Sequence, residues 1–133
     1  MTTIFDTNAL IAMLDDSEPH YEWAVAQLED CKAQGVVVIP DIVYSELSVG
    51  MASKAEIDDV IKSLGLERLP AKDEALFNAG KAYKLYKSRK GTKTNVLPDF
   101  LIGAAAEFEN APLVTANAKD FAGYFPKVQL IAP

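Results

Sequence analysis

The sequence has few of the residues that disulfide frameworks and soft metal sites require. It contains one cysteine, Cys31, and one histidine, His20, among its 133 residues. A single cysteine excludes an intrachain disulfide and a multi-cysteine zinc site, and a single histidine excludes an imidazole-rich metal centre. We therefore expect Cys31 to be a small core residue and His20, which follows Pro19, to start a helix.

The sequence also lacks the glycine patterns and long apolar runs that mark two other classes of protein. Its seven glycines are scattered, with no G-x-G-x-x-G or P-loop pattern, which argues against a nucleotide-binding domain with a glycine-rich phosphate loop. No apolar run approaches the roughly 18 residues of a membrane span. The segment MTTIFDTNALIAML has neither the basic region nor the long apolar region of a signal peptide. We expect a cytoplasmic protein without a membrane partner.

The composition is that of one globular domain over residues 1–133. Hydrophobic residues make up 50% of the chain and charged residues 24%. The net charge is −6, from 13 basic and 19 acidic residues. On the simplest interpretation this balance disfavours a nucleic-acid partner, because phosphates attract positive charge. The sum does not reveal where the charges lie, so the question stays open at this point.

Short β-prone runs alternate with helical segments along the chain. The predicted strands are 2–6, 36–39, 66–69, 112–115 and 128–131. The predicted helices are 7–14, with Thr7 or Asn8 as its cap, then 20–34, 42–50, 54–64, 73–90 and 99–109. This alternation predicts an α/β fold with a parallel sheet of about four to five strands and helices on both faces. Ligand sites in such sheets form beyond the carboxyl ends of the strands, where the strand order reverses.

Four acidic residues differ from the rest, which lie among polar neighbours and are expected to be solvated. They stand at a strand end, at a helix start, inside an apolar helix or after a strand: Asp6, Asp99, Glu46 and Asp120. Taken singly, Asp6 and Asp99 suit helix caps, and Asp120 suits a turn. Glu46 is costly to bury without a partner, although it could also face solvent.

Taken together, these carboxylates indicate a metal site. Carboxylates gathered in one cleft repel one another and raise each other's pKa values. A hard divalent cation relieves that repulsion, and Mg²⁺ and Mn²⁺ prefer oxygen ligands. The natural reaction of such a site is phosphodiester hydrolysis, in which the metal activates water and stabilises the leaving oxygen.

Four segments resemble, in order and spacing, those of PIN-domain ribonucleases. They are Ile4–Ile11, Ser45–Leu47, Pro98–Ala106 and Leu113–Phe121. The match spans nearly the whole chain, whose size is similar to that of VapC-like toxins of toxin–antitoxin pairs. The resemblance implies a Mg²⁺- or Mn²⁺-dependent endoribonuclease with a PIN-like fold. It also implies a homodimer and an antitoxin partner whose tail covers the acidic site. The alternative is a non-toxin PIN domain that acts in RNA processing or as a protein-docking module.

The resemblance assigns roles to individual residues. Asp6, Glu46 and Asp99 match the acidic core that holds the metal and performs catalysis. Asp120 matches the fourth acidic position, with Asn117 as the alternative, acting through a bound water.

Two further residues are expected to support this acidic core, and one position departs from the family pattern. Thr115 is expected to orient the attacking water, and Asn8 to support the metal ligands. The chain departs from the family at Ala116, where members usually carry an arginine, so the resemblance assigns no arginine to substrate or partner contact at this position.

Basic residues gather shortly before Asp99. Six of the 13 cations fall between Lys81 and Lys93, and five of them are predicted to bind RNA: Lys84, Lys87, Arg89, Lys90 and Lys93. The alternative is a solvated helix face. The interleaved Tyr83 and Tyr86 could stack on bases, but apolar neighbours favour the core for them. With acids assigned to a metal and bases gathered beside them, a net charge of −6 does not exclude an RNA substrate.

Overall fold

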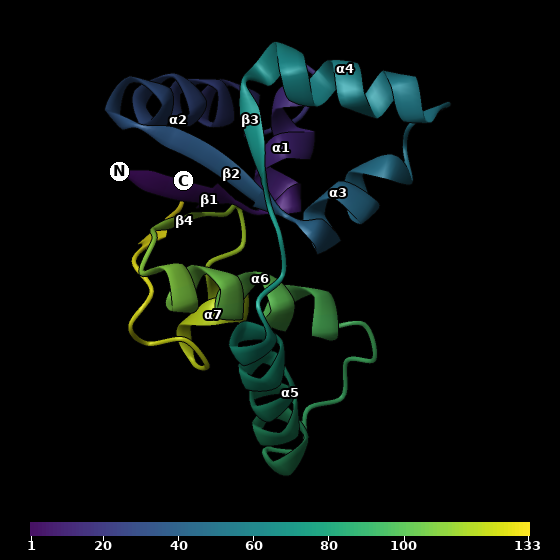
Figure 1. Ribbon diagram of the computed structural model, residues 1–133. Helices are drawn as coiled ribbons and strands as arrows, with labels where there is room; N and C mark the ends of the chain where they lie inside the picture. Colours follow the sequence, from purple (N-terminus) through teal and green to yellow (C-terminus); the bar gives the residue numbers. More distant parts are fainter.

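Five short strands form one parallel sheet in the order β3-β2-β1-β4-β5 (Figure 1). The strands are β1 (Thr2–Phe5), β2 (Val36–Pro40), β3 (Leu66–Leu69), β4 (Leu113–Val114) and β5 (Leu130–Ile131). The helices are α1 (Thr7–Leu14), α2 (Tyr21–Gln34), α3 (Asp41–Ser48), α4 (Lys54–Leu64), α5 (Asp73–Ser88), α6 (Leu97–Glu109) and α7 (Lys119–Ala122). The computed structural model describes all residues 1–133 and confirms the predicted α/β fold. No helix is long and apolar enough to cross a membrane.

Helices cover both faces of the sheet. In Figure 1, α1 and α2 lie above it, and α5, α6 and α7 lie below it. The α7 helix was not predicted, because four residues are too few to show an apolar period. The long helix ends at Ser88, two residues earlier than predicted, since Lys90 has a left-handed φ of 61°.

The predicted cap of the first helix is wrong. Asp6 occupies the cap position of α1, and no side chain caps this end of the helix. The side chain of Asn8 instead accepts a hydrogen bond of 3.0 Å from the backbone N–H of Ala116. Asn8 therefore ties the start of α1 to the segment that follows β4.

The strand order reverses beside β1. The chain runs from β1 to β2 and on to β3 at one edge, and then returns to place β4 on the other side of β1. The carboxyl ends of β1 and β4 are thus neighbours, with Phe5 paired with Val114. Asp6 and Thr115, the residues that follow these strands, meet at the point where open parallel sheets build their ligand sites.

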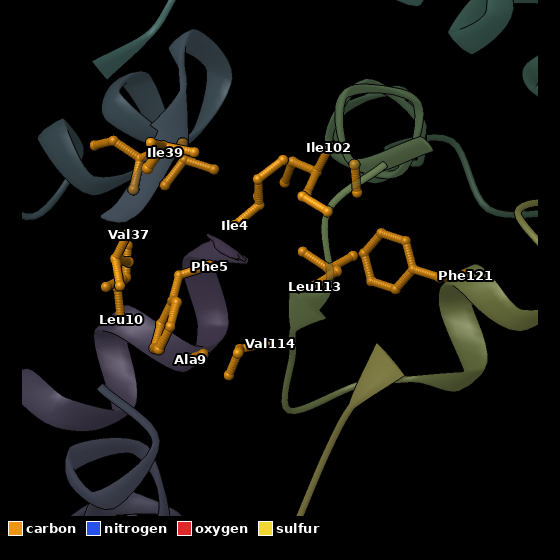
Figure 2. Packing of buried hydrophobic residues seen from close by; sticks show 14 of the residues in the cluster. Ile4, Phe5, Ala9, Leu10, Val37, Ile39, Ile102, Leu113, Val114 and Phe121 are labelled. Carbon is orange, nitrogen blue, oxygen red and sulfur yellow. The ribbon is translucent and has the colours of Figure 1, made fainter. Parts of the chain in front are cut away.

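The core forms on both sides of β1. Ile4 and Phe5 point to opposite faces, as successive strand residues must, and both are fully buried. Figure 2 shows Ile4 turned toward Ile102, while Phe5 lies near Ala9. Asp6 follows these two residues directly, so a rigid, buried strand fixes its backbone.

Replacing Gly103 by alanine should destabilise the protein by about 1–3 kcal/mol, because overpacking a filled core is costly. A Cβ atom at Gly103 would lie 2.4 Å from ring atoms of Phe125, which is itself 2% exposed and has no room to move. Gly80→Ala is the matched control: it lies in α5 with no atom within 4 Å of the new Cβ. That variant should gain about 0.5–1 kcal/mol. Chemical denaturation measures both, and equal midpoints for the two variants would contradict this packing.

Candidate active site

Asp6 is a buried carboxylate at the end of β1. Only 3% of the residue is exposed, and the Thr115 hydroxyl donates a hydrogen bond of 2.8 Å to its Oδ2 atom. Burial raises the pKa of Asp6 to about 6, although hydrogen bonds from Thr115 and the Thr7 backbone oppose the rise. The negative charges of Glu46 and Asp120 raise this pKa further. Asp6 is thus a carboxylate whose charge the fold itself leaves poorly balanced.

Asp99 lies in the first turn of α6 and is half-buried. Burial, followed by the charges of Asp6, Asp120 and Glu46, raises the pKa of Asp99 to about 7, and Lys93 opposes the rise. Each of these carboxylates comes from a different segment of the chain. Because Glu46 and Asp120 each raise the pKa values of both Asp6 and Asp99, the fold brings the four predicted acids near one another.

Glu46 belongs to the cluster and is not a freely solvated residue. It is half-buried on α3, and its Oε1 atom accepts a hydrogen bond of 2.6 Å from the hydroxyl of Thr7. Thr7, the first residue of α1, directly follows Asp6. The sequence indicated only a capping role for Thr7, because nothing in it reveals that α1 and α3 meet here.

Asp120 and Asn117, the two candidates for the fourth position, are hydrogen-bond partners. The Asn117 side-chain amide donates to Oδ2 of Asp120. The other carboxylate oxygen, Oδ1, lies 3.5 Å from Nζ of Lys93. The side chain of Asp120 is 19% exposed, so it reaches solvent at the edge of the cluster. In this arrangement Asn117 holds Asp120 in place.

Thr115 and Asn8 form a hydrogen-bonded support beneath Asp6. Thr115 is fully buried; its hydroxyl donates to Asp6 and its Oγ1 accepts from the backbone N–H of Asn117 at 3.0 Å. Asn8 accepts from the next amide, that of Ala116. These bonds join the ends of β1 and β4 and fix the orientation of the Asp6 carboxylate. Orientation of an attacking water by Thr115 stays a prediction.

The predicted basic residues are placed unequally with respect to the acids. Lys93 is beside Asp120, whereas Lys84, Lys87, Arg89 and Lys90 lie on or just after the end of α5. Lys87 lies 5.7 Å from the Tyr83 ring centroid, and the guanidinium of Arg89 lies 5.3 Å from that of Tyr124. Lys93 is therefore the member of the set that the structure brings to the acidic cluster.

Two aromatic residues of α5, Tyr83 and Tyr86, pack on the core, whereas Phe77 on the same helix is exposed. The rings of Tyr83 and Tyr86 meet Phe100 edge-on, with centroids 6.3 Å and 5.8 Å away. Both tyrosines therefore pack against the core on one side, as the core interpretation predicts, and both stay partly exposed on the other. A second lysine, Lys119, lies near the cluster: with Lys93, Asp99 and Asp120 it lines a hollow on that side of the molecule. Lys119 was not predicted from the sequence, because its position depends on the unpredicted α7.

The donor set fits a hydrated divalent cation. The candidate ligands are all carboxylates, which hard cations prefer, and two of them have raised pKa values that a cation would reverse. No group of three or more His, Cys, Asp or Glu side chains stands close enough to enclose an ion. An ion that keeps several waters and takes one or two carboxylates directly suits this open arrangement better than a fully dehydrated one.

The chain is similar to several solved toxin–antitoxin structures. One is VapBC2 from Rickettsia felis bound to a promoter DNA fragment, with 23% identity and a TM-score of 0.77. The match covers 99% of this chain and 98% of that chain. VapBC-1 from nontypeable Haemophilus influenzae matches at 22% identity, TM-score 0.74 and the same coverage. A toxin–antitoxin complex from Klebsiella pneumoniae matches at 28% identity and TM-score 0.67, over 98% of this chain and 97% of that chain.

A family model supplies the assignment. No curated protein matches the sequence. The PIN domain model matches residues 3–124, which include all four acids of the cluster. PIN nucleases are hydrolases that generally use divalent metal ions. Because that model covers most of the sequence, this chain belongs to the PIN domain family.

Proposed function

We propose that this protein is an endoribonuclease dependent on Mg²⁺ or Mn²⁺ and the toxin of a toxin–antitoxin pair. The observation that carries the proposal is the cluster of Asp6, Glu46, Asp99 and Asp120 at the switch point of the sheet. The charges of Glu46 and Asp120 raise the pKa values of Asp6 and Asp99, and such crowding of carboxylates destabilises a protein without a cation. Their retention in the fold is explained by a metal-dependent reaction on a phosphodiester.

Each residue has a role that follows from its contacts. Asp6 and Asp99, the two with raised pKa values, hold the cation, and Glu46 and Asp120 complete the site directly or through water. Thr115 and Thr7 keep Asp6 and Glu46 in their rotamers by hydrogen bonds. A bound divalent ion supplies charge stabilisation at the phosphate and a water of lowered pKa.

The proposed partners are an antitoxin and a second copy of the chain. The similar structures are described as toxin–antitoxin complexes, and the acidic cluster suits the basic side chain of a partner's tail. A separate apolar groove of about 270 Å³ lies between α3, α5 and α6, with Leu76 and Phe108 45% and 41% exposed. Such a patch is typical of a subunit contact, and we propose a homodimer through it.

Purified protein should cleave single-stranded or loop RNA in Mg²⁺ or Mn²⁺ and stop in excess chelator, as seen by gel electrophoresis of labelled RNA. Undiminished cleavage in chelator would contradict the metal-dependent mechanism.

Expression of the protein should arrest growth, and co-expression of the neighbouring open reading frame should relieve the arrest. A non-toxin RNA-processing domain would cleave without arresting growth, and a docking module would not cleave at all.

A further inference from the structure

A hollow of about 380 Å³ lies beside the acidic cluster, on the side of Asp99 and Asp120. It is bounded by the loop before α6, by the start of α6 and by α7. Besides the two carboxylates and the buried Val96 and Phe100, its walls carry two lysines, Lys93 and Lys119, and the aromatic rings of Tyr86 and Tyr124. The volume lies within the range of small-ligand sites, and the mixture of cations and rings suits a nucleotide.

The fold holds Lys93 at the mouth of this hollow. The backbone N–H of Lys93 donates a hydrogen bond of 2.8 Å to the Tyr86 hydroxyl. A Cβ atom at Gly91 would lie 2.2 Å from the Tyr86 ring, so glycine allows the loop to fold against that ring. The loop is therefore anchored to α5 by two contacts, and it presents the Lys93 side chain to Asp120.

The ammonium group of Lys93 is free to change partner. It lies 3.5 Å from Asp120 Oδ1, while its side chain remains 64% exposed. Exposed ion pairs of this kind are worth at most about 1 kcal/mol, so a phosphate that enters the hollow can take over the contact. Lys119 is exposed on α7 and lines the same hollow, which provides a second cation for that phosphate.

The aromatic wall offers a surface for a base. Tyr86, Phe100 and Tyr124 form one cluster with centroid separations of 5.2 to 6.0 Å. Phe100 is 2% exposed, whereas both tyrosines are partly exposed. Tyr86 and Tyr124 are thus packed against Phe100 and line the hollow with partly exposed rings, and the Arg89 guanidinium, 5.3 Å from the Tyr124 centroid, adds a third cation beside them.

We propose that this hollow binds the single nucleotide next to the cleaved phosphodiester, with its phosphate between Lys93 and Lys119 and its base against Tyr124. The inference rests on the proposed function, because it assumes an RNA substrate. It explains how an RNA chain approaches four carboxylates. On the side where the RNA enters, the positive charges of the two lysines offset the repulsion between the carboxylates and the RNA phosphates.

Lys93→Ala and Lys119→Ala should each lower kcat/KM for RNA cleavage about tenfold, and Lys93→Arg should retain most of the activity. Lys62→Ala, which changes an exposed lysine on α4, is the matched control, and its kcat/KM should stay within about twofold of wild type.

Binding of a labelled short RNA to cleavage-inactive Asp6→Asn protein, followed by anisotropy, gives a second readout. Each alanine variant should reduce the slope of log K against log salt, and the double variant should reduce it by about 0.7, the value for one phosphate contact on a single strand. Tyr124→Leu should weaken binding, and Tyr124→Phe should not.

Failure of the nucleotide site can be distinguished from failure of the proposed function. Wild-type protein that cleaves no RNA would overturn the proposed function and this inference together. Wild-type cleavage with both lysine variants equal to Lys62→Ala, in rate and in salt slope, would overturn the nucleotide site alone. A loss of activity with an unchanged salt slope would also overturn it, because that result indicates a structural role for the lysines.

Discussion

Asp6→Asn and Asp99→Asn should each lower the rate of RNA cleavage by about 10³-fold or more. Each change removes a negative charge from the centre of the acidic cluster while it preserves the shape of the side chain. The loss of a carboxylate ligand weakens the hold on the cation, whose stabilisation of phosphate charge is worth several kcal/mol. In the Asp6→Asn variant the Thr115 hydroxyl can still donate to the new side-chain amide oxygen, so the fold should survive.

Cleavage rates of labelled RNA in saturating Mg²⁺ measure this effect, and circular dichroism shows that each variant is folded. Asp59→Asn is the matched control, because Asp59 is an exposed acid on α4 away from the cluster. It should cleave at the wild-type rate. Full activity of either cluster variant would remove that carboxylate from the mechanism.

Without metal, the protein should lose about 1–3 kcal/mol of stability as the pH rises from 5 to 8. Burial, and the charges around them, raise the folded-state pKa values of Asp6 and Asp99 from 3.8 to about 6 and about 7. At pH values between the unfolded pKa and these folded-state pKa values, the folded protein binds more protons than the unfolded chain. The free energy of unfolding therefore falls as the pH rises through this window. Because Asp99 is partly exposed, solvent screens its charge, and its contribution to this loss of stability is small.

Thermal unfolding at several pH values in chelator measures this slope. Asp6→Asn should have a smaller slope than wild type and a higher melting temperature at pH 8, whereas Asp59→Asn should follow wild type. Added Mg²⁺ should stabilise wild type at pH 8 by mass action and stabilise Asp6→Asn much less. A wild-type stability that rises steadily from pH 5 to 8 in chelator would contradict the raised pKa values of Asp6 and Asp99.

The sequence predicted the features that depend on local pattern. Alternating apolar runs predicted the strands and helices, and the bounds of 54–64 and 66–69 agree with α4 and β3. The ends of these elements carry local signals, such as Gly65 in the left-handed conformation after α4. The four acids were singled out in the same way, from their apolar surroundings.

The contacts that organise the site could not be predicted in this way. The Thr115 hydroxyl bonds to a carboxylate 109 positions away, and Thr7 bonds to Glu46 across 39 positions. Both pairs depend on which strands and helices become neighbours, and side-chain periodicity does not reveal that. Lys119 was missed for the same reason, since only the packing of α7 brings it near Asp99.

The claim that the four carboxylates form a divalent-metal centre is tested most directly by anomalous diffraction from crystals that contain Mn²⁺. We predict an anomalous peak within about 2.5 Å of carboxylate oxygens of Asp6 or Asp99, with Glu46 and Asp120 bound directly or through ordered water. The Asp6→Asn variant should show a weaker peak or none. Crystals with no peak at the cluster, at a Mn²⁺ concentration that supports RNA cleavage, would contradict the metal-centre claim.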